Sequence, residues 1–498
     1  MSTVYLLTLE ALDAADNPVT LRFASGDYHA DGNNWPPRLS RPMLFAGRAR
    51  LPWLRDVSTS QGDLELANAD GRLDYLIDYA IDGRAMTIQT WDGATLRTVL
   101  RGTVARVEAA RASIRLILRD PAEYLSNDHP HAVYAGDGTD LEGDADIAGQ
   151  PKPQVLGAVS NATPVLVDYG MQIYQVSSLV DCTITAARDR GVPLTAGAPY
   201  ADQAELLDQA LTPAAGTFRA WQGFVRLGET AQSLTVDAEQ ASAHGADVLE
   251  QLVTAAGGTV ATPPVQQEPY ITADGSAYET ADGSDYQVTS APLSALVGIY
   301  LSDTRSTASM LDELAASIGG FWRTNADGDV AMSLLLIGTP ADVIPEHRVL
   351  DIERQRGGAG DNGLPVYRVT VRADRVATVQ NDLAAGATRR ARWQSEYRAF
   401  RATDDEVRTR HPLSRELTVD TALRAGGQIL ADRLGALLAP RRDSTQVTAR
   451  LDQYGDREIG ETVTVEHPRF GYAGGRDMIV LGRTPDAEAG AVTLEVWG

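Results

Sequence analysis

The stretch GDGTDLEGDADIAGQPKPQVLG, residues 136–157, decides how the chain is divided. It crowds glycines, prolines and carboxylates together, a composition typical of turns and irregular connections, because few of its side chains can join a core. Short alternating runs precede it, and the apolar run PVLVDYGMQIYQVS follows from Pro164. The pattern predicts an irregular connector that buries almost nothing, placed between two β-rich domains.

The residues before the connector form short, β-branched runs that alternate between apolar and polar positions, as half-buried strands do. Asp-Gly pairs separate the runs at 31–32, 70–71, 82–83 and 92–93, and both residues tolerate the positive φ of tight hairpin turns. A small β-barrel or sandwich is therefore expected. Its strands are predicted at 4–12, 20–24, 63–68, 86–93, 97–110 and 112–120.

The charge balance bears on the partners of the chain. Its 498 residues include 44 Lys and Arg against 67 Asp and Glu, a net charge of −23, and Lys152 is the single lysine. Such acidity repels nucleic acid and lacks the basic footprint of a DNA-binding protein. No run approaches the roughly 20 apolar residues of a membrane span, and the start lacks the basic and apolar regions of a signal peptide. We expect a soluble protein that does not insert into a membrane.

The sequence shows no set of residues with the spacing of a metal-binding site. Cys182 is the single cysteine, which excludes disulfides within the chain and zinc or iron–sulfur sites built on several thiolates. His129 and His131 flank a proline and are read as loop residues. The segment from Asn68 to Asp74 resembles a calcium loop, but its glycine stands at position 4 where an EF-hand loop needs it at position 6. A hairpin turn is expected there, and no metal or cofactor is predicted.

The middle of the chain predicts a second β-rich domain with an intervening helix at 200–211 and strands at 164–170, 172–177, 218–228 and 233–239. Phe218, Trp221 and Phe224 are read as core residues, although a carbohydrate-binding module could also display them. An octapeptide repeat follows, TADGSAYE at 272–279 and TADGSDYQ at 280–287. Such short repeats cannot bury a core alone, so a hairpin arm touching another subunit and a disordered linker both remain open.

Two helices are predicted in the second half. Residues 306–318 place Met310, Leu314 and Ile318 on one face after a Ser306 cap, and a hairpin turning at 325–328 follows. Near the C-terminus, an amphipathic helix is expected to carry Leu423, Leu430, Leu434 and Leu437 on one side and to end at Pro440. Three strand segments complete the chain.

An arginine-rich segment reverses the local charge. Eleven arginines face six acidic residues between 368 and 415. Arg389, Arg390 and Arg392 are the candidate protein-interface residues, expected to meet the acidic surface of a neighbouring protein. The rival interpretation has them grip phosphate while Trp393 stacks on a base.

Four parts of the chain resemble the tail-tip and baseplate hub proteins of tailed bacteriophages. They are the connector, the phrase GFVRLGETAQSLTVDAE at 223–239, the helix and hairpin LDELAASIGGFWRTNADGDV at 311–330, and the C-terminal region with its GETVTV turn at 460–465, PRFG at 468–471 and final Trp497-Gly498. The resemblance implies a ring, usually a homotrimer, that joins the tail tube and distal tail protein to the central fibre or spike. It further implies contact with the tape measure protein, and DNA as passing cargo only.

Catalytic motifs give little support to an enzyme. The chain has no Gly-x-Ser-x-Gly elbow, no His-Glu-x-x-His motif and no P-loop, and its carboxylates cluster in Asp-Gly turns. A pair of carboxylates is all that a glycosidase needs, so a tail-associated cell-wall glycosidase remains an alternative, as does a carbohydrate-binding receptor module.

The sequence thus predicts a mainly β (α+β), multi-domain, ring-forming hub of small β-barrel or sandwich domains with a few packing helices. The protein is not expected to be an enzyme. It is expected to be made in the host cytoplasm and to reside in the virion, at the tail tip or baseplate. The predicted units are an N-terminal β-barrel-like domain (1–125), the connector (126–160), a second β-rich domain (161–262), the repeat arm or linker (263–290), an α+β domain with the helix–hairpin unit (291–415) and a C-terminal helix with a small β-domain (416–498).

Overall fold

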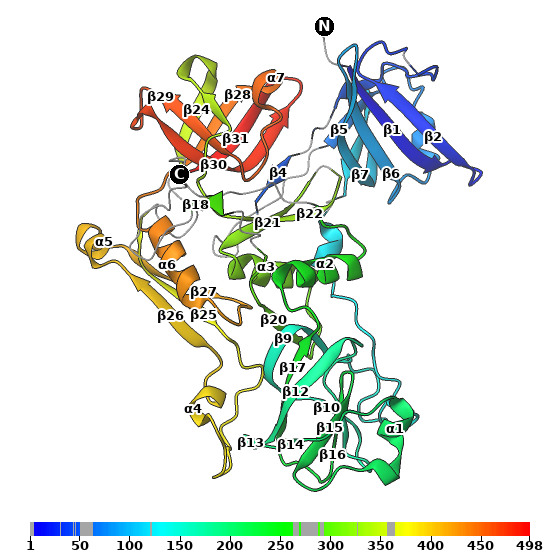
Figure 1. Ribbon diagram of the computed structural model, residues 1–498. Coiled ribbons are helices and arrows are strands. Elements are labelled where there is room, and N and C mark those ends of the chain that lie inside the picture. Colours follow the sequence, from blue (N-terminus) through cyan, green and yellow to red (C-terminus); the bar gives the residue numbers. More distant parts are fainter. Residues whose placement is uncertain are drawn as a thin grey trace.

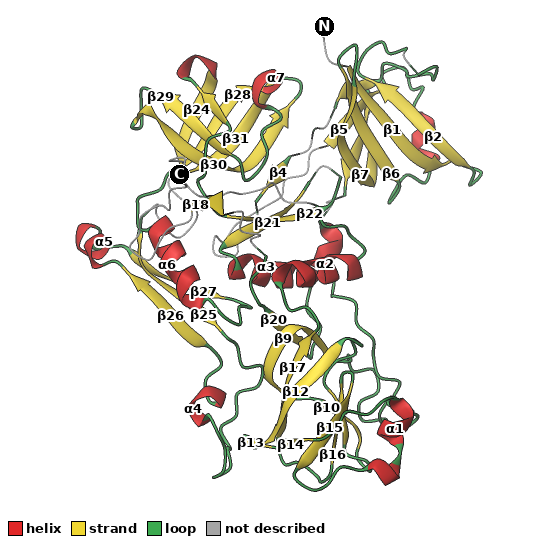
Figure 2. Cartoon of the chain, viewed as in Figure 1, coloured by secondary structure: helices red, strands yellow, loops and turns green. Residues whose placement is uncertain are grey.

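The computed structural model describes residues 4–29, 31–42, 44, 46–49, 63–119, 122–261, 268–269, 287–288, 293–325, 327–355 and 364–498. They fold into several β-rich units with a few helices between them, so the predicted fold class is confirmed (Figures 1 and 2). The N-terminal and C-terminal β-units lie side by side at one end of an elongated body, a helical layer lies below them, and another β-unit forms the far end.

The N-terminal unit is an antiparallel sheet in the order β2-β1-β6-β7-β8-β5-β3. Its alternating positions bury an apolar core that includes Leu9, Leu66 and Ile88. The expected strands are present, and a short 3-10 helix, η1 (Asp74–Asp78), follows the turn at Gly71. The strands are β1 (Val4–Leu12), β2 (Pro18–Ala24), β3 (Leu39–Arg41), β5 (Asp63–Ala67), β6 (Ala85–Trp91), β7 (Leu96–Ala109) and β8 (Ser113–Leu118).

The connector differs from the prediction at its end. After the short 3-10 helix η2 (Glu123–Ser126), residues 127–153 contain no helix or longer strand, as expected of the composition. The last four residues of the quoted stretch, however, begin strand β9 (Gln154–Ala162), and Val155 and Leu156 are fully buried. The prediction that this stretch buries almost nothing is therefore wrong. Its glycines and prolines concealed the start of a central strand that pairs with a neighbour on each side.

The second β-unit consists of two sheets around one core. Their orders are β10-β11-β16-β15-β14 and β13-β12-β17-β9-β20. The helix expected at 200–211 is present only as α1 (Gln203–Leu207) and the 3-10 turn η3 (Gln209–Leu211). The strands are β10 (Val165–Asp168), β11 (Ile173–Gln175), β12 (Cys182–Asp189), β13 (Val192–Pro193), β14 (Thr195–Ala196), β15 (Thr217–Trp221), β16 (Phe224–Leu227), β17 (Leu234–Gln240) and β20 (Gly298–Leu301).

A helical layer links the two ends of the body. Helix α3 (Thr307–Ser317) begins at the predicted Ser306 cap, whose hydroxyl accepts a hydrogen bond from the Ser309 amide. Gly319 follows at φ +58°, and the predicted hairpin β21 (Gly320–Thr324) and β22 (Val330–Leu334) continues from it. Helix α2 (Gly245–Ala255) packs beside α3 and was missed, although its Val248, Leu249, Leu252 and Val253 are buried at helical spacing.

A small sheet with the order β26-β25-β27 stands beside this layer, and α6 (Gly427–Leu438) covers its apolar face. The C-terminal helix was predicted to include Leu423. The chain instead forms strand β27 (Arg415–Asp420), and the helix starts only after Gly426 at φ +78°, so Leu423 joins the core before the helix begins. The other strands are β25 (Val366–Ala373) and β26 (Arg398–Thr403), with helices α4 (Arg390–Trp393) and α5 (Asp405–Arg410) on either side of β26.

The C-terminal unit is a sheet in the order β23-β29-β30-β31-β28-β24, and β4 (Gly47–Arg48) from the N-terminal part pairs with β30. The predicted strands are present, with α7 (Leu451–Tyr454) and the 3-10 turn η4 (Glu346–Arg348) beside them. The strands are β23 (Asp342–Ile344), β24 (Val349–Gln355), β28 (Ser444–Arg450), β29 (Thr462–His467), β30 (Tyr472–Asp486) and β31 (Ala491–Trp497).

The octapeptide repeat lies outside the described residues except for its last residue, Gln287. Two short strands pair antiparallel: β18 (Glu268–Pro269), which precedes the repeat, and β19 (Gln287–Val288), which begins at its last residue. The choice between an arm and a linker stays open, and the predicted domain boundaries stay predictions.

Candidate protein-interaction surface

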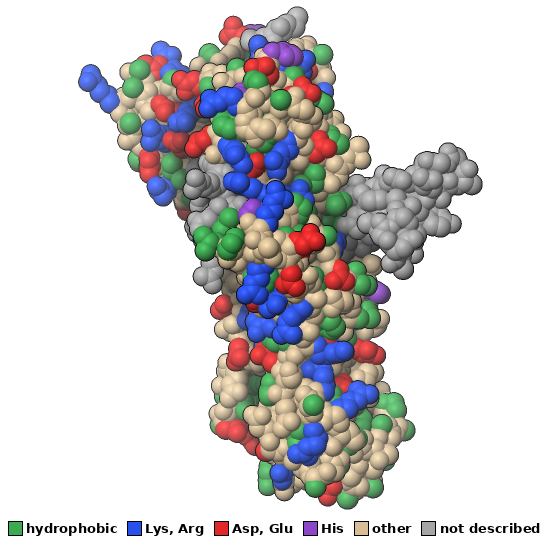
Figure 3. Space-filling model, turned by 90° about the vertical axis from the view of Figure 1, so that its left-hand side faces the viewer, with side chains coloured by type: hydrophobic (Ala, Val, Ile, Leu, Met, Phe, Trp, Pro, Cys, Tyr) green, Lys and Arg blue, Asp and Glu red, His purple; other side chains and the backbone are tan. Residues whose placement is uncertain are grey.

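The arginine-rich segment lies along one long side of the molecule, on the left in Figure 1. It supplies β25, β26 and α5 together with a loop, residues 374–397, that we call the clasp. In β25, Val369, Val371 and Ala373 are buried while Arg368 and Arg372 alternate with them on the other face of the sheet. Basic side chains gather along this face in Figure 3. The period-two pattern that makes the strand therefore also displays its arginines.

The three candidate interface arginines have different surroundings. Arg389 is exposed and stands at φ +50° just before α4. Arg390 donates from Nη1 to the Ala384 carbonyl at 2.5 Å, within the clasp. Arg392 is half-buried, donates to the carbonyls of Asp374 and Ser395, and forms an ion pair with Asp374 at 3.2 Å. Arg390 and Arg392 thus brace the clasp, and Arg389 alone of these three presents its side chain outward without such a bond.

Trp393 does not face solvent. Its side chain is 3% exposed, its Nε1 donates to the Thr388 carbonyl at 2.8 Å, and the Arg188 guanidinium lies 4.3 Å from its ring centre. A base cannot reach this ring. The rival interpretation, in which Trp393 stacks on nucleic acid, is therefore wrong in its stacking residue.

The clasp is docked on the second β-unit. The amides of Ala377 and Thr378 donate to the carbonyls of Ser160 and Asn161 at 2.9 and 3.0 Å. Further along, the Ala384 amide donates to the Arg190 carbonyl at 2.9 Å. A small apolar cluster of Val376, Leu383 and Trp393 fills the space beneath the loop.

The turn after α5 carries exposed side chains that were not among the predicted interface residues. Leu413 is 83% exposed, the highest value among the large apolar side chains of the described residues. Arg408 and Arg410 are exposed nearby and have no ion pair within the described part of the chain. The turn is ordered by hydrogen bonds from the His411 amide to the Val407 carbonyl and from the Ser414 amide to the His411 carbonyl, each 2.8 Å. The exposed apolar residue that follows Arg408 and Arg410 was the missed signal.

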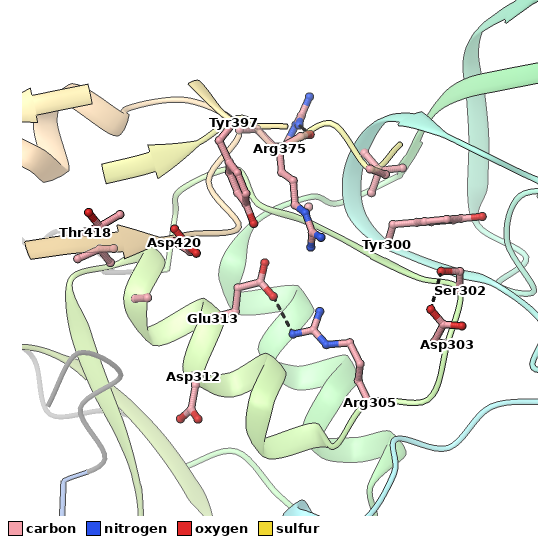
Figure 4. A pocket seen from close by; sticks show the side chains of 16 residues that line it. Tyr300, Ser302, Asp303, Arg305, Asp312, Glu313, Arg375, Tyr397, Thr418 and Asp420 are labelled. Carbon is pink, nitrogen blue, oxygen red and sulfur yellow. Dashed lines mark hydrogen bonds and ion pairs between the residues drawn. The ribbon is translucent and has the colours of Figure 1, made fainter. Parts of the chain in front are cut away.

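A polar cleft of about 630 Å³ lies between α3, the end of β20 and the two ends of the clasp (Figure 4). Glu313 on its floor pairs with Arg305 at 2.9 Å, and Arg375 faces it from the clasp side and pairs with Glu396 at 3.1 Å. Asp420 pairs with Arg372 on the neighbouring strand. Burial raises the pKa of Tyr397, which also lines the cleft. These carboxylates are therefore already engaged by guanidinium groups as hydrogen-bond acceptors.

Residues that could suggest metal or thiol chemistry lie in structural positions. His129 is buried with its Nδ1 3.2 Å from the Thr307 hydroxyl, and burial lowers its pKa. Burial raises the pKa of the Cys182 thiol to about 12. The Asn68 side chain accepts from the Leu73 amide at 2.8 Å, and Asp70 pairs with Arg38 at 2.6 Å. In the described residues no cluster of three His, Cys, Asp or Glu side chains could hold a metal.

The aromatic residues of the second unit form part of its interior. Phe218 is 4% exposed, and the rings of Trp221 and Phe224 stack at 5.9 Å with both side chains partly buried. The core interpretation is confirmed for Phe218. Among the described residues no helix has the length and apolar character needed to cross a membrane.

Comparison with known proteins gives likenesses in structure. No family model and no curated protein matches the chain. The chain is similar to a tail protein from Neisseria meningitidis MC58, with 11% identity, 99% of this chain and 96% of that chain covered, and a TM-score of 0.43. The 43 kDa tail protein of prophage MuSo2 from Shewanella oneidensis gives 12% identity, coverage of 99% and 96%, and a TM-score of 0.38.

A third similar chain belongs to the virion of a native gene transfer agent particle, with 13% identity, coverage of 70% of this chain and 84% of that chain, and a TM-score of 0.36. The first two of these similar chains are described as tail proteins, and the third is described only as part of a virion.

Proposed function

We propose that the protein is a structural hub component of a bacteriophage tail tip or baseplate. In this role it joins the tail tube and distal tail protein to the central fibre or spike and forms part of the channel through which DNA leaves. The proposal starts from the resemblance of four sequence segments, whose order along the chain is that of the hub proteins. It places the protein in the virion.

The observation that carries the proposal is the apolar junction of three units. Ala49 from the N-terminal part, Phe321 and Leu335 from the hairpin region, and Ile459 and Ile479 from the C-terminal unit form one buried cluster. Buried apolar contacts of this kind hold units in a fixed relation, whereas polar contacts between domains usually permit movement. A fixed scaffold suits a part that transmits load between tail components.

Charge supports the channel part of the proposal. A net charge of −23 gives every copy in a ring excess negative charge. Because like charges repel over about a Debye length, roughly 8 Å at physiological salt, DNA would pass without adhering. Closed rings of identical chains are the usual form of such assemblies, and a homotrimer is the form we propose.

The arginine-rich face supplies the proposed contact with neighbouring tail proteins. Arg389, Arg390 and Arg392 stay the candidate interface residues, with Arg389 as the member whose guanidinium has no bond inside the clasp. Opposite charges across an interface guide encounter and fix register more than they raise affinity. A neighbour with an acidic surface, including the distal tail or tape measure protein, fits this face.

Particles produced without the protein provide the test. The proposal expects tail tubes that lack a closed tip, or no complete tails, in electron micrographs of lysates from a deletion strain, with recovery when the intact chain is supplied in trans. Complete, infectious tails in the deletion strain would refute a hub function.

The polar cleft is the place where a glycosidase site could lie, because Glu313, Asp303 and Asp420 all line it. Two of these carboxylates are held in ion pairs, with Arg305 and Arg372. We therefore favour a structural role for the cleft as a braced joint between α3, β20 and β27.

A further inference from the structure

The polar cleft beside α3 lies in a fork between two strands. At the base of the fork the chain before β20 pairs antiparallel with the chain after β27. The Gly298 amide donates to the Ala422 carbonyl at 2.8 Å, and the Arg424 amide donates to the Leu296 carbonyl at 2.9 Å. Beyond this point β20 joins the sheet of β9 while β27 joins the sheet of β25. The two strands therefore diverge, and residues of both line the cleft of about 630 Å³.

The β27 side of the fork is an unpaired strand edge. The Thr421 amide donates to the Arg372 carbonyl at 3.0 Å, which fixes the parallel register of β27 on β25. Because the backbone groups of a strand alternate between its two edges, Val419 bonds toward β25, whereas Thr418 and Asp420 present their N–H and C=O groups on the opposite edge. Neither residue makes a backbone hydrogen bond there within the described part of the chain.

The β20 side is an unpaired edge as well. Tyr300 lies opposite Val155 in the antiparallel pairing with β9. The Val155 amide donates to the Ser177 hydroxyl at 3.2 Å, so it does not bond to Tyr300. The pair is therefore a non-hydrogen-bonded one, in which the backbone groups of each residue point away from the partner strand. The N–H and C=O groups of Tyr300 have no partner among the described residues.

Both edges thus open onto the same cleft. In Figure 4, Tyr300 lies on one side and Thr418 and Asp420 lie on the other, with Glu313 of α3 between them. No proline in residues 298–302 or 416–420 blocks either edge. An unpaired edge is a template for a further strand, and the cleft volume lies within the range of about 300–1,000 Å³ that is usual for ligand sites. The occupant that matches two rows of backbone groups is an extended polypeptide.

The charges of the cleft indicate the side chains that such a segment carries. Each of the three guanidinium groups in the lining already has a carboxylate partner: Arg305 with Glu313, Arg375 with Glu396, and Arg424 with Asp374. Asp303 also lines the cleft, is exposed, and has no ion pair within the described residues. The cleft therefore offers an uncompensated carboxylate and no uncompensated cation, which favours a basic segment over an acidic one.

We propose that the cleft binds an extended segment of a neighbouring tail protein, which adds as a strand between β27 and β20 and places an arginine or lysine beside Asp303. Its backbone bonds to Thr418 and Asp420 on one side and to Tyr300 on the other. In such strand addition the main-chain hydrogen bonds supply affinity and the side chains supply specificity. The inference rests on the proposed function, in which the chain joins other tail proteins, and it names a surface for one of these contacts.

Hydrogen exchange measured by mass spectrometry on the purified full chain and on purified tails tests the proposal. In the chain alone, the amides of Thr418 and Tyr300 should exchange rapidly, because no internal hydrogen bond protects them. In tails the same two amides should exchange at least about tenfold more slowly, because the added strand accepts a hydrogen bond from each. The comparison uses the protein without any substitution, so misfolding of a variant cannot imitate the result.

A single proline provides a second test. Thr418→Pro removes a donor from the open edge of β27 without removing a bond to β25. The matched control is Thr403→Pro, on the opposite edge of the same sheet. The Asp404 amide donates to the Tyr367 carbonyl at 2.8 Å, so the N–H of Thr403 also points away from β25. Both variants should melt as the wild type does, and Thr418→Pro alone should weaken peptide binding, by about tenfold or more.

The peptide probe is a fluorescein-labelled heptapeptide of six threonines around a central arginine, because threonine favours the extended conformation. Fluorescence anisotropy should show that it binds the wild-type chain. Replacing its arginine by glutamate should weaken binding by about fivefold or more. Asp303→Asn should weaken binding of the arginine peptide by about twofold to fivefold, as expected of one exposed ion pair. Equal binding of the arginine and glutamate peptides would overturn the assignment of a basic segment.

The remaining outcomes also decide. If tails contain the chain but its Thr418 and Tyr300 amides exchange as fast as in the free chain, the proposal fails while the hub function stands. If tails lack the chain, both fail. Protection that grows with the concentration of the free chain would identify a second copy as the occupant. Protection of the free chain by a chitin tetrasaccharide would assign the cleft to a glycan, and either result would overturn the proposal.

Discussion

Arg48 and Glu495 form an ion pair with 2.9 Å between Nε and Oε2. One residue belongs to the first part of the chain and the other to the last strand. The backbone beside them continues the contact, since Arg48 lies opposite Gly482 in the β4–β30 pairing. The ion pair and the strand pairing therefore fix residues 47–48 directly to the C-terminal sheet.

Phe321→Ala tests how strongly that scaffold depends on its apolar junction. Phe321 is fully buried in the cluster shared by three units. Removing the ring should lower the free energy of unfolding by about 3–5 kcal/mol, the usual cost of a large aromatic deletion in a core. Calorimetry should then resolve separate transitions for the units. Tyr169→Ala, at a side chain that is 70% exposed, is the control, and equal melting of both variants would contradict the junction.

The candidate interface arginines should separate into two classes. Arg392→Glu places a carboxylate against Asp374 in a half-buried site, so amide exchange should quicken across residues 374–397. Arg389→Glu should leave exchange unchanged, because exposed substitutions usually alter stability by about 0.5 kcal/mol or less, and yet it should impair tail assembly.

Micrographs of lysates made with Arg389→Glu report the assembly result. Normal, complete tails with Arg389→Glu would speak against an interface at this residue. Assembled tails that fail at DNA ejection would instead indicate guidance of DNA.

Because of the Arg38–Asp70 ion pair, we expect the stability of the fold to depend on pH in the acidic range. The hydrogen bonds from Arg38 lower the pKa of Asp70 to about 2. Because the folded pKa lies below the unfolded value of about 3.9, the pair stabilises the fold above that value, and its contribution disappears as pH falls from about 4 to about 2. The Tm difference between wild type and Asp70→Asn should therefore shrink over this window.

Asp92→Asn is a poor control for the Arg38–Asp70 pair. The backbone amides of Thr95 and Ala94 also lower the pKa of the Asp92 carboxylate, although no cation binds it in bidentate fashion. Carbon-13 titration of the Asp70 carboxyl group measures the pKa directly. A midpoint near 4 would show that the pair is absent in solution.

No cleavage of peptidoglycan or polysaccharide is expected from the cleft. Glu313 and Asp420 are held by Arg305 and Arg372, so neither is free to act as a proton donor without breaking an ion pair. Release of reducing sugars from cell-wall preparations is the measurement. Turnover that Glu313→Gln abolishes, with Asp303→Asn as a parallel variant, would move the protein into the glycosidase class.

Local patterns in the sequence predicted many elements well. The Ser306 cap, the helix that follows it and the hairpin turning near Gly328 were found where expected, because capping, helical spacing and turn chemistry act over a few residues. The N-terminal strands were predicted for the same reason. Helix α2, which was not predicted, carries a comparable signal in Val248, Leu249, Leu252 and Val253.

Features that depend on distant partners were harder to predict. Strand β9 begins inside a stretch that composition marks as a turn, and Gly157 there is required because a Cβ would lie 2.2 Å from the Val297 carbonyl. The run of arginines in the sequence correctly predicted a basic face. It did not show which of these arginines form bonds within the chain and which are free to contact a neighbour. Arg392 faces Asp374 only because the clasp folds back, and Leu413 stands out only once its exposure is known.

A three-dimensional reconstruction of the assembled particle tests the central claim most directly. The account predicts density for this chain in a closed ring at the distal end of the tail tube, most simply three copies, with the arginine-rich face against a neighbouring chain. Absence of the chain from complete particles, or its location in the head or along the tube, would contradict the account.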